Sequence, residues 1–218
     1  MKKIEIVGEE IDRNAKQMSN EVNNEVNERM KVVLVGNSGV GKSTYVKMMY
    51  TGEYKEKHEP TVGCEVIPLD WLVKYAGKEE SQVNRKSKGC KEAKLVIDVW
   101  DTAGNSKVGG LTEAYYNGAD ACICMFDVLN KKSFENLDGW IAKFRRVSNA
   151  PIYILGNKID VAEIKIGNKK LDEFVCSREL KGGWLISAKS RYAFEKVFLE
   201  IAKLKFGENM LLYGDTSK

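Results

Sequence analysis

The sequence predicts an α/β domain built on a mostly parallel six-stranded sheet flanked by helices. The first observation is a series of short apolar runs, rich in β-branched residues, at 32–35, 95–100, 121–126, 152–155 and 184–186. Runs of this kind are typical of buried parallel strands. The second observation is that amphipathic stretches lie between most of the runs, at 42–50, 111–116, 133–147 and 192–204. This alternation indicates a sheet covered by helices.

The composition fits one globular domain. The chain has 218 residues, of which 43% are hydrophobic and 30% are charged. That balance is too apolar for a disordered chain, and no run approaches the roughly 18 apolar residues that a membrane-spanning helix requires. We therefore expect a soluble protein, and a monomer.

Two segments depart from the strand and helix pattern. Residues 1–29 are polar, with five basic and seven acidic side chains, and their apolar stripe is too thin to bury much surface. We expect a polar N-terminal extension, partly ordered at most, before a domain that spans 30–218. Residues 74–94 carry six Lys and one Arg against three Glu, which predicts a basic insertion between strands.

Counts of the reactive residue types exclude several classes of protein. The chain has one histidine, His58, so a Ser-His-Asp hydrolase or a two-histidine metalloprotease has almost nothing to build from. Its five cysteines form no C-x-x-C pair, which argues against a zinc site and fits a reducing compartment. The net charge of +4 gives no reason to expect nucleic-acid binding. Since the last cysteine is Cys176, we expect no lipid anchor at the C-terminus.

The first strand leads into a phosphate-binding loop. Residues 36–43 read GNSGVGKS, which fits the pattern G-x-x-x-x-G-K-S/T between a strand and a helix. Glycines allow backbone N–H groups to surround phosphate oxygens, and the helix N-terminus adds partial positive charge. Lys42 is expected to reach the β- and γ-phosphates, and the Ser43 hydroxyl to bind Mg²⁺. The predicted nucleotide contacts in this loop are Ser38, Gly39, Val40, Gly41, Lys42, Ser43 and Thr44.

A second polar motif, WDTAG at 100–104, ends another apolar run. Its position places Asp101 at the carboxyl edge of the sheet, where open α/β folds bind ligands. Asp101 is therefore expected to hold Mg²⁺ through a water molecule, and the Gly104 N–H to meet the γ-phosphate.

The motif NKID at 157–160 selects the base. The Asp160 carboxylate can accept two hydrogen bonds from the N1 and N2 donors that guanine has and adenine lacks, which argues against an ATPase or a nucleotide kinase. Lys158 is expected to lie across the base plane, and Asn157 to tie this loop to the phosphate loop. The segment from Ser187 through Ala188 to Lys189 adds a backbone N–H for the guanine O6 and a second covering lysine.

These motifs, in this order, resemble the Ras-like small GTPases over residues 30–215. Within that superfamily the sequence is most similar to the Ran family of nuclear transport. The similar positions are Lys47, 51–54, 109–111, 115–116, 125–128, 186–190, Tyr192, 194–196 and 198–199. The phosphate loop, with Ser38, looks more like that of the Rab family.

The resemblance implies a P-loop NTPase with a Ras-like G domain, Mg²⁺ as cofactor and GTP or GDP as ligand. It places Thr61 where a threonine binds Mg²⁺ and the γ-phosphate, and Tyr54 where an aromatic ring meets the guanine edge. Asn105 stands where Ran and Ras have the glutamine that orients the attacking water. The implied catalytic set is Asn105, Lys42, Thr61 and Gly104, with slow hydrolysis expected because of Asn105. His58 replaces a switch tyrosine of Ran.

The resemblance also implies a GTP/GDP switch of nucleocytoplasmic transport in the nucleus and cytoplasm. Its partners would be an importin-like carrier, an exchange factor and an activating protein. The sequence has no counterpart of Ran's acidic tail, and residues 176–179 replace the basic patch that meets it, so partners that use this patch are expected to bind weakly. Two alternatives remain open: a GTP-locked binding protein with negligible hydrolysis, and a Rab-like traffic regulator.

Overall fold

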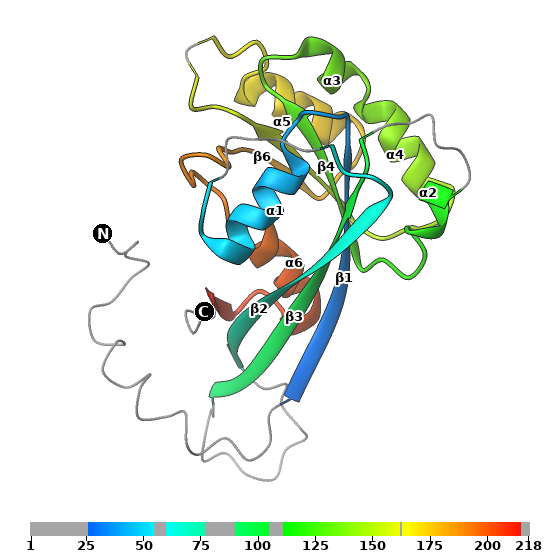
Figure 1. Ribbon diagram of the computed structural model, residues 1–218. Coiled ribbons are helices and arrows are strands. Elements are labelled where there is room, and N and C mark those ends of the chain that lie inside the picture. The colour runs from blue at the N-terminus through cyan, green and yellow to red at the C-terminus, as the bar shows by residue number, and fades with distance from the viewer. Residues whose placement is uncertain (1–25, 55–59, 77–89, 105–110, 162, 215–218) are drawn as a thin grey trace.

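The computed structural model describes residues 26–54, 60–76, 90–104, 111–161 and 163–214, which form one seven-stranded sheet with helices packed against it (Figure 1). The strands are β1 (Val26–Gly36), β2 (Cys64–Ala76), β3 (Cys90–Thr102), β4 (Ala121–Asp127), β5 (Ile152–Asn157), β6 (Gly182–Leu185) and β7 (Met210–Gly214). The helices are α1 (Lys42–Thr51), α2 (Leu111–Ala114), α3 (Lys131–Glu135), α4 (Leu137–Arg145), α5 (Asn168–Ser177) and α6 (Lys196–Phe206).

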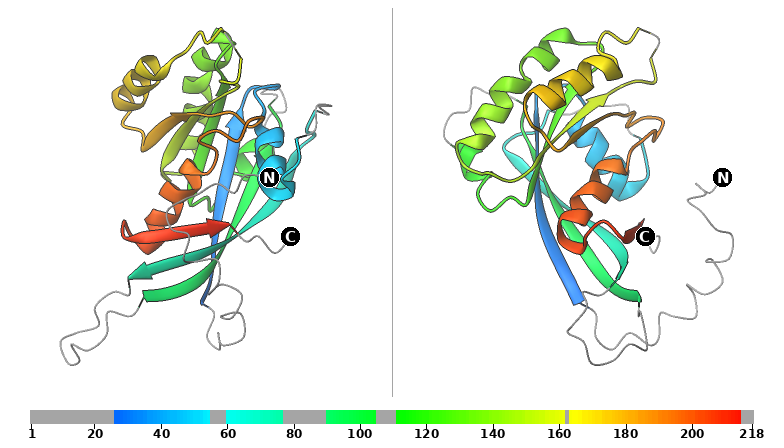
Figure 2. Two further views of the ribbon diagram at one scale, coloured as in Figure 1. Left: turned by 90° about the vertical axis from the view of Figure 1, so that its left-hand side faces the viewer. Right: turned by 180° about the vertical axis from the view of Figure 1, so that it is seen from behind.

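The order of the strands is β6-β5-β4-β1-β3-β2-β7. The first five in this order are parallel, and β2 and β7 each pair antiparallel with their neighbours. The sheet therefore has seven strands, not the six predicted. Two strands, β2 and β7, correspond to none of the predicted runs. They pair with each other, with Met210 opposite Tyr75 and Gly214 opposite Trp71. Figure 2 shows β7 along β2.

Alternation along the strands divides the core into two halves. In β1, Val32 and Leu34 face a cluster that includes α1 and α6, whereas Val33 and Val35 face a cluster that includes α3, α4 and α5. All four side chains are fully buried. Burial of both faces explains why the central strands are continuous apolar runs and not alternating ones.

Several predicted boundaries change. β1 begins at Val26, so four residues assigned to the N-terminal extension belong to the sheet, while residues 1–25 lie outside the described residues. The strand β2 extends to Ala76, and β3 begins at Cys90. Of the predicted insertion, 77–89 lie outside the described residues. The helix expected over 133–147 is two helices, because the chain turns at Asn136. The helix expected over 192–204 begins at Lys196, and α5 was not predicted.

The parallel strands β1, β3, β4 and β5 all end at one edge of the sheet, and the loops that follow them converge there. This is the edge at which open α/β sheets bind ligands. Among the described residues, no helix is long and apolar enough to cross a membrane.

Candidate functional site

The phosphate loop joins β1 to α1, and two of its glycines are required by close backbone approach. Gly36 has a φ of 143°, and a Cβ there would lie 2.2 Å from the carbonyl oxygen of Met125. Gly41, the N-cap of α1, has a φ of 99°, and a Cβ there would lie 2.3 Å from Nδ2 of Asn157. Any other residue at these positions would clash and adopt a strained backbone, so the loop keeps its curved path only with glycine.

Lys42 lies over the inner side of this loop. Its Nζ donates hydrogen bonds to the carbonyl oxygens of Gly36, at 2.8 Å, and Asn37, at 3.0 Å. Burial lowers the pKa of Lys42 to about 8, and the nearby Asp101 carboxylate opposes this effect. A buried ammonium held by neutral carbonyls would gain strongly from an anionic phosphate placed beside it.

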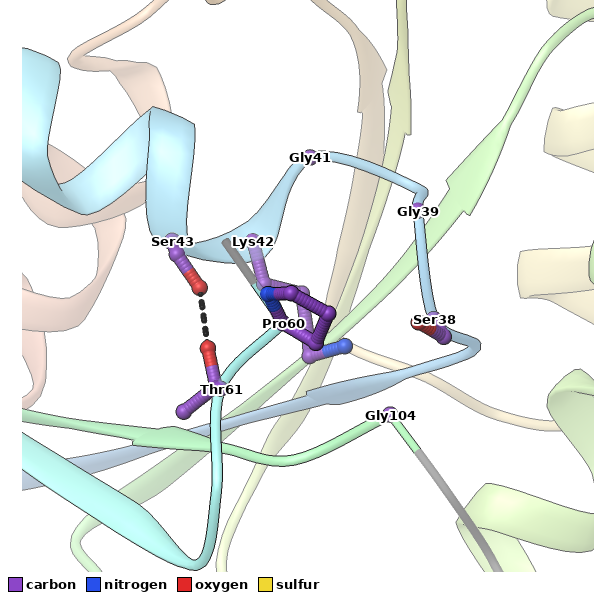
Figure 3. Close-up of a pocket in the computed structure, with 8 residues that line it drawn as sticks. All are labelled: Ser38, Gly39, Gly41, Lys42, Ser43, Pro60, Thr61 and Gly104. Atoms are coloured by element: carbon purple, nitrogen blue, oxygen red, sulfur yellow. Dashed lines mark hydrogen bonds between the residues drawn. The ribbon is translucent and has the colours of Figure 1, made fainter. Parts of the chain in front are cut away.

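Three oxygen-bearing side chains from different parts of the chain meet beside Lys42. The Ser43 hydroxyl donates to Oδ2 of Asp101 at 2.5 Å and lies 2.7 Å from the Thr61 hydroxyl, which in turn lies 3.4 Å from the same carboxylate oxygen. We call these three residues the hydroxyl–carboxylate cluster. It joins α1, β3 and the segment before β2 (Figure 3 shows the Ser43–Thr61 contact).

The hydroxyl–carboxylate cluster fits a magnesium ion. Asp101 is fully buried, and its Oδ1 has no hydrogen-bond partner. Burial raises the pKa of Asp101, although the hydrogen bond from Ser43 and the charge of Lys42 lower it. A buried carboxylate oxygen without a partner is costly, and a hard cation that prefers oxygen ligands would satisfy it. No group of three or more His, Cys, Asp or Glu that could hold a metal occurs among the described residues. An ion bound by Asp101 would therefore take its other protein ligands from hydroxyl groups such as those of Ser43 and Thr61.

These residues line a pocket on the carboxyl edge of the sheet, shown in Figure 3. Its lining residues are Ser38, Gly39, Gly41, Lys42, Ser43, Pro60, Thr61 and Gly104. Gly104 was predicted to direct its N–H at the γ-phosphate, but its observed contact is through its carbonyl, which accepts a 3.1 Å hydrogen bond from the Ser38 N–H. A Cβ on Gly104 would lie 2.3 Å from that nitrogen, so only glycine allows this close approach.

Asn157 connects the phosphate loop to the two segments expected to hold the base. Its Nδ2 donates to the carbonyl oxygen of Val40 at 3.0 Å, and its Oδ1 accepts from the Ala188 N–H at 3.0 Å. The side chain is 3% exposed, so both contacts are made away from water. One amide therefore fixes the relative positions of three loops.

Asp160, whose carboxylate is predicted to read the guanine edge, is an exposed residue. Its Oδ1 accepts a 2.7 Å hydrogen bond from the Ser187 hydroxyl, which orients it. On the other side of this region, the Lys189 ammonium lies 5.7 Å from the centre of the exposed Tyr54 ring. A bound base would supply the burial that makes the carboxylate selective.

Not every predicted site residue enters this arrangement. Thr44 lies in α1, half-buried, one position beyond Ser43, and it does not line the pocket. Asn105 and His58 lie outside the described residues.

The structure also shows functional positions that the motifs did not indicate. Pro60 lines the pocket, and the Trp140 indole donates a 2.8 Å hydrogen bond to Oδ1 of Asn37 in the phosphate loop. Asp127, the last residue of β4, accepts a 2.7 Å hydrogen bond from Nζ of Lys158. A charged residue at the end of an otherwise apolar strand was the one available signal, and it marked Asp127.

A sheet of this topology, with a glycine-rich loop between β1 and α1 and a base-reading motif after β5, defines a P-loop nucleotide-binding protein with a G domain. The protein-family model described as Ras family matches residues 31–205. The chain belongs to the Ras family. It is thus a small GTPase. Members of this group bind guanine nucleotides and Mg²⁺, hydrolyse GTP and act as molecular switches that bind regulators and effectors.

Proposed function

We propose that this chain is a Ran-like GTP/GDP switch of nucleocytoplasmic transport that acts in the nucleus and cytoplasm and hydrolyses GTP slowly. The observation that carries the switch is the hydroxyl–carboxylate cluster. Thr61 precedes β2, and its hydroxyl contacts Ser43 of the phosphate loop and Asp101 of β3. A segment that closes over phosphate through such contacts can be held in the GTP state and released after hydrolysis.

Each residue has a distinct part in nucleotide binding. Lys42 would neutralise the β- and γ-phosphates, the cluster would hold Mg²⁺, and Asn157 would keep the base loops in register with the phosphate loop. Bound Mg²⁺ would neutralise charge on the bridging phosphate oxygens. Asp160 and the Ala188 N–H would read the guanine edge, between the Lys158 and Lys189 side chains.

Support for a Ran-like role comes from the sequence. The similarity to Ran includes 125–128, at the end of β4, and 186–190, in the segment that follows β6. Importin-like carriers, an exchange factor and an activating protein are the partners that this role requires. The phosphate loop resembles that of the Rab family more than that of the Ran family. The experiment for the transport role must therefore distinguish it from a Rab-like role in vesicle traffic.

A GTP-locked binding protein is a second candidate, and Asn105 favours it. Asparagine is one methylene shorter than the glutamine of Ran and Ras, so an amide at this position falls short of the attacking water. Such a protein would bind effectors persistently and turn over little. The two candidates share the nucleotide site and differ only in the rate of hydrolysis.

Carrier binding tests the transport role. The purified chain, loaded with GTP or with GDP, is titrated against importin-type carriers. Thr61→Ala, checked for its nucleotide content before each titration, is the variant that removes the Thr61 hydroxyl from the pocket. We expect binding by the GTP form alone and its loss in Thr61→Ala. Equal binding of both nucleotide states, or GTP-dependent binding only to vesicle-tethering factors, would reject the transport role.

A further inference from the structure

The lysine expected to cover the guanine base is held at its charged end by two oxygen acceptors. Nζ of Lys158 donates to the Gly39 carbonyl at 2.8 Å and to Oδ2 of Asp127 at 2.7 Å. Gly39 belongs to the phosphate loop, and Lys158 follows β5. The aliphatic stem of Lys158 therefore runs from the end of β5 to the phosphate loop.

We propose that Asp127 is a positioning residue for nucleotide retention, acting through Lys158. By fixing the ammonium group, Asp127 keeps the aliphatic stem of Lys158 where it can pack against one face of the guanine ring. This inference rests on the proposed guanine-nucleotide binding, and it adds a residue that lies outside the motifs at 36–43, 100–104 and 157–160 and the segment 187–189.

The fold holds Asp127 rigidly in this place. It pairs with Asn157 in the register of β4 and β5, which puts its carboxylate beside the residue that precedes Lys158. Its other oxygen, Oδ1, accepts from the Leu129 N–H at 2.9 Å, and the Ser133 hydroxyl contacts its backbone N–H at 3.0 Å. Asp127 is 9% exposed. Both carboxylate oxygens thus have fixed partners, one of which is the lysine.

The backbone of Lys158 also needs support. Its φ is 78°, a left-handed conformation that costs conformational free energy in a residue with a Cβ. Contacts on either side maintain it: the Asn157 amide is anchored at both ends, and the Ile159 N–H donates to the Ile186 carbonyl at 3.3 Å. The Asp127 ion pair completes this support at the side-chain end.

A lysine side chain without such contacts samples many rotamers. If base binding has to order it, the conformational entropy that is lost makes the binding free energy less favourable. Asp127 fixes the stem in advance, so its effect should appear in the residence time of the nucleotide. The guanine edge is read by Asp160, so the choice of base should not depend on Asp127. The Lys158 side chain is 37% exposed, so solvent weakens the ion pair and the effect should be moderate.

The isosteric variant Asp127→Asn isolates this contact. An asparagine can accept from the Leu129 N–H or from Lys158, but its amide nitrogen then faces the other donor. We expect release of a fluorescent GDP analogue into excess unlabelled GDP to be about 5-fold faster, with the preference for guanine over xanthine unchanged. Asp138→Asn is the matched control, since Asp138 pairs with Arg178 at 2.5 Å between α4 and the end of α5, outside the described pocket.

A double-mutant cycle shows whether Asp127 acts through the lysine. In a Lys158→Met background, Asp127→Asn should change the release rate by less than about 1.5-fold, because the ammonium that it positions is gone. Stopped-flow detection reads this rate even when the nucleotide is weakly held. A wild-type release rate in Asp127→Asn, or the same acceleration in both backgrounds, would overturn the inference. Failure of the wild-type chain to bind the GDP analogue would instead reject the proposed nucleotide binding.

Discussion

The Ser43 hydroxyl donates a 2.5 Å hydrogen bond to Oδ2 of Asp101, although the two residues are 58 positions apart. This contact connects the first turn of α1 to the end of β3 and leaves the second carboxylate oxygen, Oδ1, buried without a partner. A hydroxyl and a carboxylate held at this separation form the start of an oxygen-lined cation site. The neighbouring Thr61 hydroxyl extends the site to the segment before β2.

Replacing the hydroxyl tests the cation site. We predict that Ser43→Asn weakens binding of Mg²⁺-GTP by at least about tenfold while GDP binding falls much less, because the ion bridges the β- and γ-phosphates. Isothermal titration with each nucleotide, with and without EDTA, measures the difference. An equal loss of affinity for GTP and GDP would show that Ser43 has another role.

A substitution at Asp160 tests its proposed role in base selection. We predict that Asp160→Asn weakens GTP binding by roughly 10- to 100-fold, because charge-assisted hydrogen bonds to the guanine donors are lost. The same variant should prefer xanthosine triphosphate, whose edge offers an acceptor in place of the 2-amino donor. Competition between the two nucleotides for one fluorescent probe gives the preference. Persistent selection of GTP by the variant would contradict the assignment.

Nucleotide binding should take up a proton at alkaline pH because of Lys42. Its pKa is about 8 in the folded protein and its ordinary value is 10.5. Between these values the unfolded chain binds more protons, so the nucleotide-free protein gains stability as pH rises through this window. Phosphate favours the charged ammonium, so affinity for nucleotide should fall as pH rises above about 8.

Calorimetry checks this linkage. Titrations at about pH 9 in two buffers of different ionisation enthalpy should give different heats, corresponding to uptake of most of one proton. At about pH 7 the lysine is charged in both states and the heats should agree. Identical heats in both buffers at the higher pH would mean that Lys42 is already protonated before phosphate binds.

Hydrolysis tests the role of Asn105. Because asparagine is one methylene shorter than glutamine, its amide would fall roughly 1 Å short of the water-positioning site. A misplacement of that size can cost on the order of 10²-fold in rate, or about 2.7 kcal/mol of barrier. We predict that Asn105→Gln accelerates single-turnover hydrolysis by about this factor and barely changes GTP affinity, because the residue acts on the water. If the glutamine variant is no faster, alone or with an activating protein, the water is positioned by another group.

The sequence predicted those parts of the fold that local pattern dictates. The runs at β1, β4 and β5 have apolar residues facing both sides of the sheet, so these strands could be recognised from their own sequence without knowledge of the strands they pair with. The strand β2 was missed because its burial alternates but its sequence does not: Ile67, Leu69 and Trp71 are buried, while the apolar residues Val66 and Leu72 are exposed. The short β7 has only five residues and depends on pairing with β2, so its own sequence carries little signal.

The contacts of the candidate site are likewise of two kinds: local contacts, which the sequence could predict, and contacts between distant residues, which it could not. The contacts of Lys42 with the carbonyls of Gly36 and Asn37 lie within one motif, whose spacing reflects a fixed local geometry. The hydrogen bond from Trp140 to Asn37 joins residues 103 positions apart, and it exists only because α4 packs beside the phosphate loop. The pairing of Asp127 with Lys158 likewise depends on the register of β4 and β5, which no local pattern encodes.

The identity of the nucleotide carried by the purified chain tests the central claim most directly. The protein is isolated in the presence of Mg²⁺ and denatured, and the released nucleotide is identified by chromatography and mass spectrometry. Titration of nucleotide-stripped protein with guanine and adenine nucleotides accompanies it. We expect a guanine nucleotide, with tight binding that depends on Mg²⁺. An adenine nucleotide, or no nucleotide together with no guanine binding on titration, would contradict it.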